Sequence, residues 1–211
     1  MVVVYLYVGQ DVHFTHGSVN EAIQEGVRQG YDKGYLRKSM VSEPLFERVN
    51  TKDNTPCMIY TSIIDGEQVI LEITCKGAGS ENMSVIEMLK PAQGIEGVKQ
   101  TVLNAVKKAG PNACPPMVIG VGLGGSFDYA AYLAKKATVR SCDSAHPDPR
   151  YAALEDQLLS EINQLNIGPQ GLKGDTTALK VNIETHATHI ACLPCAVNIS
   201  CHITRHARRE F

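Results

Sequence analysis

Tryptophan is absent from this chain of 211 residues, and phenylalanine occurs only four times. With so few large rings, the sequence offers no set of aromatic platforms on which nucleic-acid bases could stack. A formal net charge of -2 gives no whole-chain attraction to nucleic acid or to an anionic membrane. We therefore expect neither nucleic acid nor a membrane among the partners of this protein.

Long apolar runs are missing as well. The apolar stretch at the start, Val2–Val8, is far too short to cross a bilayer, and it lacks the basic flank and cleavage site of an export signal. Seven cysteines without an export signal favour a reducing compartment, in which thiols serve as ligands or as core residues. The sequence therefore predicts a cytoplasmic protein.

Repeats and disordered linkers are also lacking, and the apolar pattern predicts a single α+β domain over residues 1–211, with a mixed or antiparallel sheet and packed amphipathic helices. Ser18 and Glu21 form a capping-box pattern, which predicts a helix to about Tyr35. Apolar runs on either side of the turn Asp65-Gly66 predict a β-hairpin. The other expected helices are Gly94–Ala109, Phe127–Ala137 and Tyr151–Leu165, and the other expected strands are Met117–Val121, Ala178–Glu184, Thr188–Leu193 and Cys195–Ile203.

The strongest chemical signal lies between Ala109 and Gly125. Cys114 stands between prolines, so the backbone on both sides of its thiol is stiff. Gly122 and Gly124 leave room for the close approach of an anionic ligand or for close packing. The segment Gly120–Gly125 also fits the letters of a dinucleotide fingerprint, but no second hydrophobic strand follows the next helix, so nicotinamide binding is set aside.

The cysteines near the end of the chain allow two kinds of metal site. Cys114 together with Cys201 and His202 predicts a site assembled from distant segments, and thiolates gathered in this way are typical of an iron–sulfur cluster. The alternative is a zinc site built from Cys192, Cys195, Cys201 and His202, although a zinc ribbon requires a second close cysteine pair.

The same part of the chain indicates a pocket for a small carboxylate. Cationic and titratable residues cluster there, namely His186, His189, His202, His206, Arg205, Arg208 and Arg209.

Motifs along nearly the whole chain resemble the α region of the class I, iron–sulfur fumarate hydratase and L-tartrate dehydratase family. In chain order, they are Gly9–His13, Gly34–Lys38, Asn50–Pro56, Lys76–Asn82, Ala109–Pro116, Gly120–Ser126, Ile167–Gly171 and His189–Arg205.

This resemblance implies the α subunit of a hydro-lyase that adds water to fumarate, with the dehydration of L-tartrate as the alternative. It implies a [4Fe–4S] cluster held by three cysteines, and Cys114 and Cys201 occupy two of those places. It further implies that Arg37 binds a substrate carboxylate, that the Gly79 backbone meets the substrate and that His189 is a catalytic and substrate-binding residue. The residues alone allow simpler interpretations, with Arg37 as a cation at a helix C-terminus and His189 as a core histidine.

The chain departs from the family pattern at its start. The first cluster cysteine of the family lies in a Cys-Gln-Asp-Thr-Gly motif directly before the strand that begins here at Val2. We expect this motif and a helical segment to precede Met1 in the natural protein. The 211 residues alone would then lack the third cluster ligand, hold no intact cluster and be inactive.

The expected partners are a β subunit of the same hydro-lyase, which contributes further substrate residues, and a small dicarboxylate. Self-association into a homo-oligomer is also expected, because it would cover exposed apolar surface. A second hypothesis is a module without a cluster that has kept the fold and lost the chemistry.

Overall fold

A computed structural model describes residues 1–211 and has the expected α+β fold. The chain divides into two compact units, which we call unit 1 (Met1–Lys76 with Arg205–Phe211) and unit 2 (Gly77–Thr204). No helix has the length and apolar character needed to cross a membrane.

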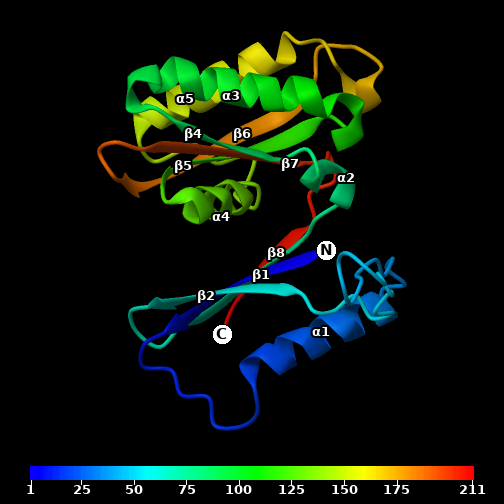
Figure 1. Ribbon diagram of the computed structural model, residues 1–211. Coiled ribbons are helices and arrows are strands. Elements are labelled where there is room, and N and C mark those ends of the chain that lie inside the picture. Colours follow the sequence, from blue (N-terminus) through cyan, green and yellow to red (C-terminus); the bar gives the residue numbers. More distant parts are fainter. The chain divides into compact units, whose positions relative to one another are not determined.

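Unit 1 combines a four-stranded mixed sheet with one helix (Figure 1). Its elements are β1 (Val2–Gly9), α1 (Val19–Lys33), β2 (Met58–Ile64), β3 (Val69–Cys75) and β8 (His206–Glu210). The strand order is β2-β1-β3-β8, and β1 runs parallel to β2 and antiparallel to β3. The predicted pairing of β2 with β3 as a hairpin is therefore wrong. Residues 2–5 of β1 are buried on both faces of the sheet. A strand that is buried in this way lies inside a sheet, and β1 accordingly lies between β2 and β3.

Gly9 ends β1 where the turn between β2 and β3 crosses over it. The Gly9 N–H donates to Gln68 O at 2.7 Å, and a Cβ at this position would lie 2.1 Å from Gly66 O. Only glycine can therefore occupy the end of the central strand.

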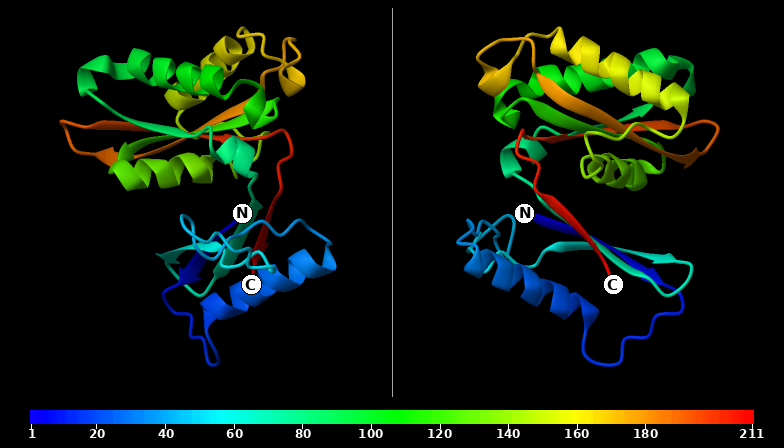
Figure 2. Two further views of the ribbon diagram at one scale, coloured as in Figure 1. Left: turned by 45° about the vertical axis from the view of Figure 1, so that its right-hand side comes forward. Right: turned by 180° about the vertical axis from the view of Figure 1, so that it is seen from behind.

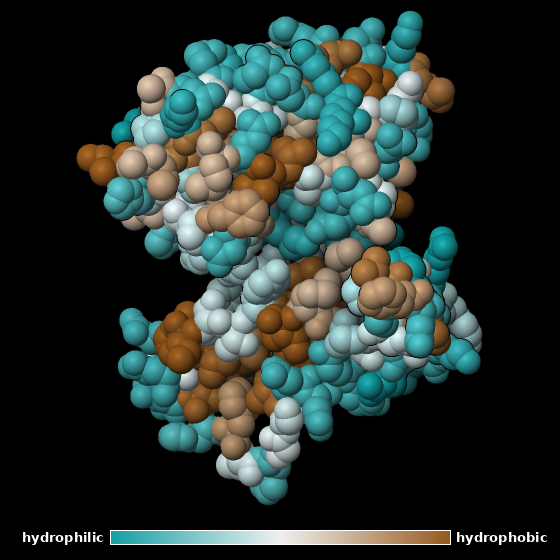
Figure 3. Space-filling view, viewed as in Figure 1, coloured by the Kyte–Doolittle hydropathy of each residue, from teal (hydrophilic) through white to brown (hydrophobic).

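Helix α1 begins as the sequence predicts, with the Ser18 hydroxyl accepting a hydrogen bond from Glu21 N at 3.4 Å. Its buried residue Val27 belongs to a small apolar cluster with β1. An apolar cavity of 590 Å³ remains between α1 and the sheet, and apolar side chains gather on this part of unit 1 (Figure 3). Gly26 and Gly30 line the cavity, so the row of glycines on α1 is not covered by another helix.

Unit 2 has a second mixed sheet with helices on both faces. Its strands are β4 (Val85–Leu89), β5 (Met117–Gly125), β6 (Ala178–Thr188) and β7 (Leu193–Ser200), and its helices are α2 (Ala78–Glu81), α3 (Gly94–Ala109), α4 (Phe127–Ala137) and α5 (Pro149–Asn163), with short 3-10 helices η1 (Pro91–Gln93), η2 (Gly110–Ala113) and η3 (Pro169–Gly171). The strand order is β4-β7-β5-β6. Helices α3 and α5 cover one face of this sheet and α4 covers the other (Figures 1 and 2).

The glycines of β5 serve helix packing. A Cβ on Gly120 would lie 2.1 Å from Ala134 O, and a Cβ on Gly122 would lie 2.1 Å from Ala130 O. Both carbonyls belong to α4, so the two glycines allow this helix to lie directly on the strand. The packing interpretation of the glycine-rich segment therefore holds at these two positions.

Both units repeat one arrangement of strands, although the sequence shows no repeat. A central strand (β1 or β5) is followed by helical structure, then by a parallel neighbour (β2 or β6), and then by an antiparallel neighbour on its other side (β3 or β7). Gly124 near the end of β5 resembles Gly9, because a Cβ there would lie 2.0 Å from His186 O.

Candidate functional site

Cys114 lies directly before β5, between η2 and that strand. Its backbone is left-handed, with φ 53° and ψ 65°, and its side chain is exposed. A non-glycine residue with this conformation is uncommon and occurs preferentially at functional sites. The structure thus presents the thiol at the surface, at the end of the sheet where β5 begins.

Cys201 lies at the same end of the sheet, because β7 runs antiparallel to β5. Ser200, the last residue of β7, pairs with Val118 near the start of β5. His202 N donates to Cys114 O at 3.3 Å, and His202 Nδ1 lies 3.0 Å from the same oxygen. The fold therefore brings the two cysteines, which are distant in sequence, to the same end of the sheet of unit 2.

Gly79 and Gln170 lie beside the Cys114 segment. A Cβ on Gly79 would lie 3.2 Å from Asn112 O in η2, so α2 packs closely against the turn that leads into Cys114. Gln170 N donates to Pro115 O at 2.9 Å, and Gln170 Nε2 lies 3.5 Å from His202 Nδ1. Gln170 was not among the predicted site residues, although its motif Ile167–Gly171 was singled out by the resemblance.

His189 lies at the opposite end of the sheet from Cys201. It occupies the turn between β6 and β7, where Cys192 N donates to His189 O at 2.8 Å. The eight residues of β7 separate this turn from Cys201, a span of roughly 25 Å at about 3.3 Å per residue. One copy of the chain therefore does not bring His189 to the two cysteines. His189 is also exposed, so the interpretation as a core histidine is wrong.

Arg37 belongs to unit 1 and lies beyond the end of α1. Helix α1 ends at Lys33, and Lys38 forms the ion pair near this end, with Lys38 Nζ at 2.9 Å from Asp32 Oδ1. Arg37 is exposed, and it is not in the last turn, where a cation would stabilise the helix dipole. The interpretation of Arg37 as a capping cation is therefore wrong, and its guanidinium is available to an anion.

The remaining cysteines do not join Cys114 and Cys201. Cys195 points into the core of unit 2, and burial raises the pKa of its thiol to about 12. Cys192 lies with His189 at the far end of β7, so the four residues of the alternative zinc site do not converge. No group of three or more metal-ligating side chains occurs in the structure.

Comparison with known proteins shows the family to which the chain belongs. The profile described as fumarate hydratase (Fumerase) matches residues 1–210. The chain belongs to the fumarate hydratase family. A candidate L(+)-tartrate dehydratase subunit alpha from Methanocaldococcus jannaschii is 41% identical over 99% of this chain and 75% of its own length. The L(+)-tartrate dehydratase alpha subunits of Escherichia coli (strain K12) and Shigella boydii are each 34% identical over 88% of this chain. The chain spans 62% of the length of these two relatives.

The donor set of this fumarate hydratase family member fits part of an iron–sulfur cluster. Thiolates are the usual ligands of such clusters, and Cys114 and Cys201 would hold two corners of a [4Fe–4S] group from neighbouring backbone positions. Both thiols have access to solvent, since Cys114 is exposed and Cys201 is half-buried. Residues 1–211 supply this pair and no third cysteine beside it.

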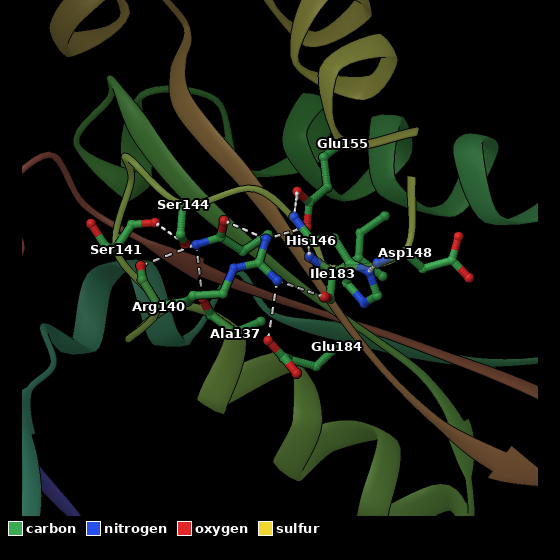
Figure 4. A network of polar contacts seen from close by, with 10 residues as sticks. Ala137, Arg140, Ser141, Ser144, His146, Asp148, Glu155, Ile183 and Glu184 are labelled. Carbon is green, nitrogen blue, oxygen red and sulfur yellow. Dashed lines mark hydrogen bonds and ion pairs between the residues drawn. The ribbon is translucent and has the colours of Figure 1, made fainter. Parts of the chain in front are cut away.

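A buried polar network fixes β6 in this fumarate hydratase family member (Figure 4). The Arg140 guanidinium forms an ion pair with Glu155, which is almost fully buried, and donates to Ile183 O at 3.0 Å. Glu155 Oε1 also accepts a hydrogen bond from Ile183 N at 2.7 Å, and Glu155 Oε2 accepts one from His146 N at 3.2 Å. One carboxylate thus joins α5, β6 and the loop after α4.

Replacing Glu155 with alanine should strongly destabilise unit 2. The change leaves the N–H groups of Ile183 and His146 without their acceptor and takes from Arg140 its most buried partner, while Glu184 still faces the guanidinium. We expect it to lower the free energy of unfolding by about 3 to 5 kcal/mol. Urea denaturation followed by circular dichroism measures the loss. The control Glu161→Ala removes a more exposed partner of Lys99 and should cost at most about 1 kcal/mol. Equal losses in the two variants would contradict a special role for Glu155.

Proposed function

We propose that this chain is the α subunit of an iron–sulfur hydro-lyase that acts on a four-carbon dicarboxylate. The observation that carries the proposal is the convergence of Cys114 and Cys201 beside Gly79. These residues come from separate segments, and membership of the fumarate hydratase family gives their convergence a chemical purpose.

L-tartrate is the substrate that we place first, because the relatives from M. jannaschii and E. coli are named for tartrate dehydratase. Fumarate, which the sequence favoured and which gives the family its name, is the second candidate. The test is to assemble the chain with its β subunit under anaerobic conditions and to assay both substrates. Activity on neither substrate, with no iron bound, would favour a module that has lost the chemistry.

Each of the five candidate site residues has a defined task in this proposal. Cys114 and Cys201 hold two corners of the cluster, which when bound supplies a Lewis acid for the departing or entering hydroxide. The exposed guanidinium of Arg37 binds one substrate carboxylate, because its planar fork matches the two carboxylate oxygens. Backbone N–H groups around Gly79 meet the substrate, and His189 acts on it.

The third thiolate is not among the cysteines that converge, so we propose that this chain alone is inactive. A cluster with two protein ligands leaves two irons open to solvent and oxygen. The missing ligand then comes from protein outside these residues, and the β subunit supplies further substrate contacts. All seven cysteines are free thiols, which a reducing compartment such as the cytoplasm preserves.

We further propose that His189 serves the site of a second copy of the chain in a homo-oligomer. The span of β7 keeps His189 away from Cys201 of its own copy. Apolar side chains are exposed at this end of the sheet. Ile190, in the turn that carries His189, is 91% exposed, and Phe127, which begins α4 just after β5, is 58% exposed. Contact between copies would cover such side chains.

Replacing Arg37 with lysine should weaken substrate binding in the assembled enzyme. Lysine keeps the positive charge and loses the bidentate fork, so we expect KM to rise about tenfold with little change in kcat. Steady-state kinetics with L-tartrate and fumarate measures this. Arg48→Lys, an exposed arginine elsewhere in unit 1, is the matched control. An unchanged KM in Arg37→Lys would remove Arg37 from the substrate site.

A further inference from the structure

Helix α2, which carries Gly79, is a single turn that cannot hold its position by itself. It contains four residues, and its N-cap Gly77 provides no side-chain hydrogen bond. Isolated helices much longer than this are marginal in water. The place of the Gly79 backbone is therefore set by contacts between α2 and larger elements of unit 2.

Glu81, the last residue of α2, makes such contacts with two elements. Its carboxylate forms an ion pair with Lys135 in the last turn of α4 and accepts a hydrogen bond from Asn198 Nδ2 in β7 at 3.1 Å. The side chains of Lys135 and Glu81 are only 16% and 20% exposed. Partial burial reduces the screening of this pair by water, so the attraction is stronger than at an open surface.

Asn198 occupies a position where an apolar residue would be expected. It is 5% exposed and lies on the face of β7 that carries Ala196, which packs on α4. Its Oδ1 is buried without a hydrogen-bond partner, and an unpaired buried acceptor costs stability. The other end of the amide is satisfied, because Nδ2 donates to Glu81 and, at 2.9 Å, to Ser84 Oγ, three residues after the end of α2.

We propose that Glu81 is a positioning residue. Held by Lys135 and Asn198, it fixes α2 against η2 and so places the Gly79 backbone beside Cys114. The inference rests on the proposed function, in which that backbone meets the dicarboxylate. Glu81 is not one of the proposed cluster ligands, so its loss should weaken substrate binding and leave the iron in place.

The local effect can be measured in the full chain without substrate or cluster. Amide hydrogen exchange of the segment 77–84 should be about tenfold faster in Glu81→Gln and in Lys135→Met than in the unmodified chain, because α2 opens more often. Lys135→Arg keeps the ion pair and should restore slow exchange. Lys99→Met is the matched control, since Lys99 and Glu161 form an ion pair of similar burial between α3 and α5.

The functional effect is measured in the enzyme assembled with its β subunit. Glu81→Gln and Lys135→Met should raise KM for the dicarboxylate about fivefold to tenfold, while kcat and iron content stay within about twofold. Lys135→Arg should return KM to normal, and Lys99→Met should not change it. A merely structural role would lower the amount of active enzyme without changing KM.

The possible outcomes separate this inference from the proposed function. Unchanged exchange in residues 77–84 would overturn the role of Glu81 in holding α2. Faster exchange with an unchanged KM would overturn its positioning role and leave the hydro-lyase function standing. An unmodified complex that acts on neither dicarboxylate would overturn the proposed function, and the link between Glu81 and substrate binding with it.

Discussion

An assembled enzyme that carries Cys201→Ser should lose its hydro-lyase activity together with its iron. Cys114 and Cys201 are the two cysteines that the fold places side by side, and a serine hydroxyl is a much poorer ligand for iron than a thiolate. Removing groups that only support metal ligands already costs about 10-fold to 100-fold in affinity or activity. The loss of a ligand should therefore lower the rate by at least about a hundredfold.

Iron and sulfide content after anaerobic reconstitution, the visible absorbance of the cluster and the initial rate report this result together. Cys142→Ser and Cys192→Ser are the controls, because these cysteines lie in a loop and at the far end of β7, and both variants should keep their iron. Full iron content and normal turnover in Cys201→Ser would remove Cys201 from the cluster. Zinc bound in place of iron would instead favour the zinc alternative.

Two inactive variants should restore activity to each other if His189 serves a neighbouring copy. His189→Asn retains both cysteines, and Cys201→Ser retains the histidine. In a mixed dimer, one site combines the intact cysteines of the first copy with the intact His189 of the second. Random pairing of equal amounts in a two-fold dimer should recover about one quarter of the normal activity.

Each variant assayed alone provides the baseline of this experiment, and a chain that carries both substitutions provides the control for mixing. Mixing the double variant with either single variant should restore no activity, because no site in the mixed dimer then has both intact cysteines and an intact His189. If mixing the two single variants restores no activity, His189 is not shared between copies. Normal iron content in His189→Asn would confirm that this residue acts on the substrate and not on the cluster.

Local signals in the sequence were sufficient for several elements. Gly94–Ala109 has the predicted bounds of α3, because its apolar residues recur at helical spacing and Gly110 stops the helix with a positive φ. Ser18 caps α1 as predicted, and the prolines around Cys114 do present its thiol at the surface. These features depend on residues that are close to one another in sequence.

Features that depend on strand order were not predictable. The Asp65-Gly66 turn is typical of a hairpin, and nothing near it shows that β1 lies between the two strands. In the same way, His189 and Cys201 share one motif of the resemblance, yet an extended strand carries them to opposite ends of the sheet. Part of the predicted strand Thr188–Leu193 is the turn that holds His189, and His206–Glu210, for which no strand was predicted, forms β8.

The order of the two units along the chain has a consequence for biosynthesis. The chain leaves unit 1 after β3, forms all of unit 2 and returns for β8, which pairs with β3. Unit 2 can therefore fold before β8 is synthesised, whereas β3 keeps an open edge until β8 has emerged from the ribosome. Open strand edges invite pairing with other chains. The strand that covers this edge carries the charged residues Arg208, Arg209 and Glu210, which disfavour further pairing with other chains once β8 is in place.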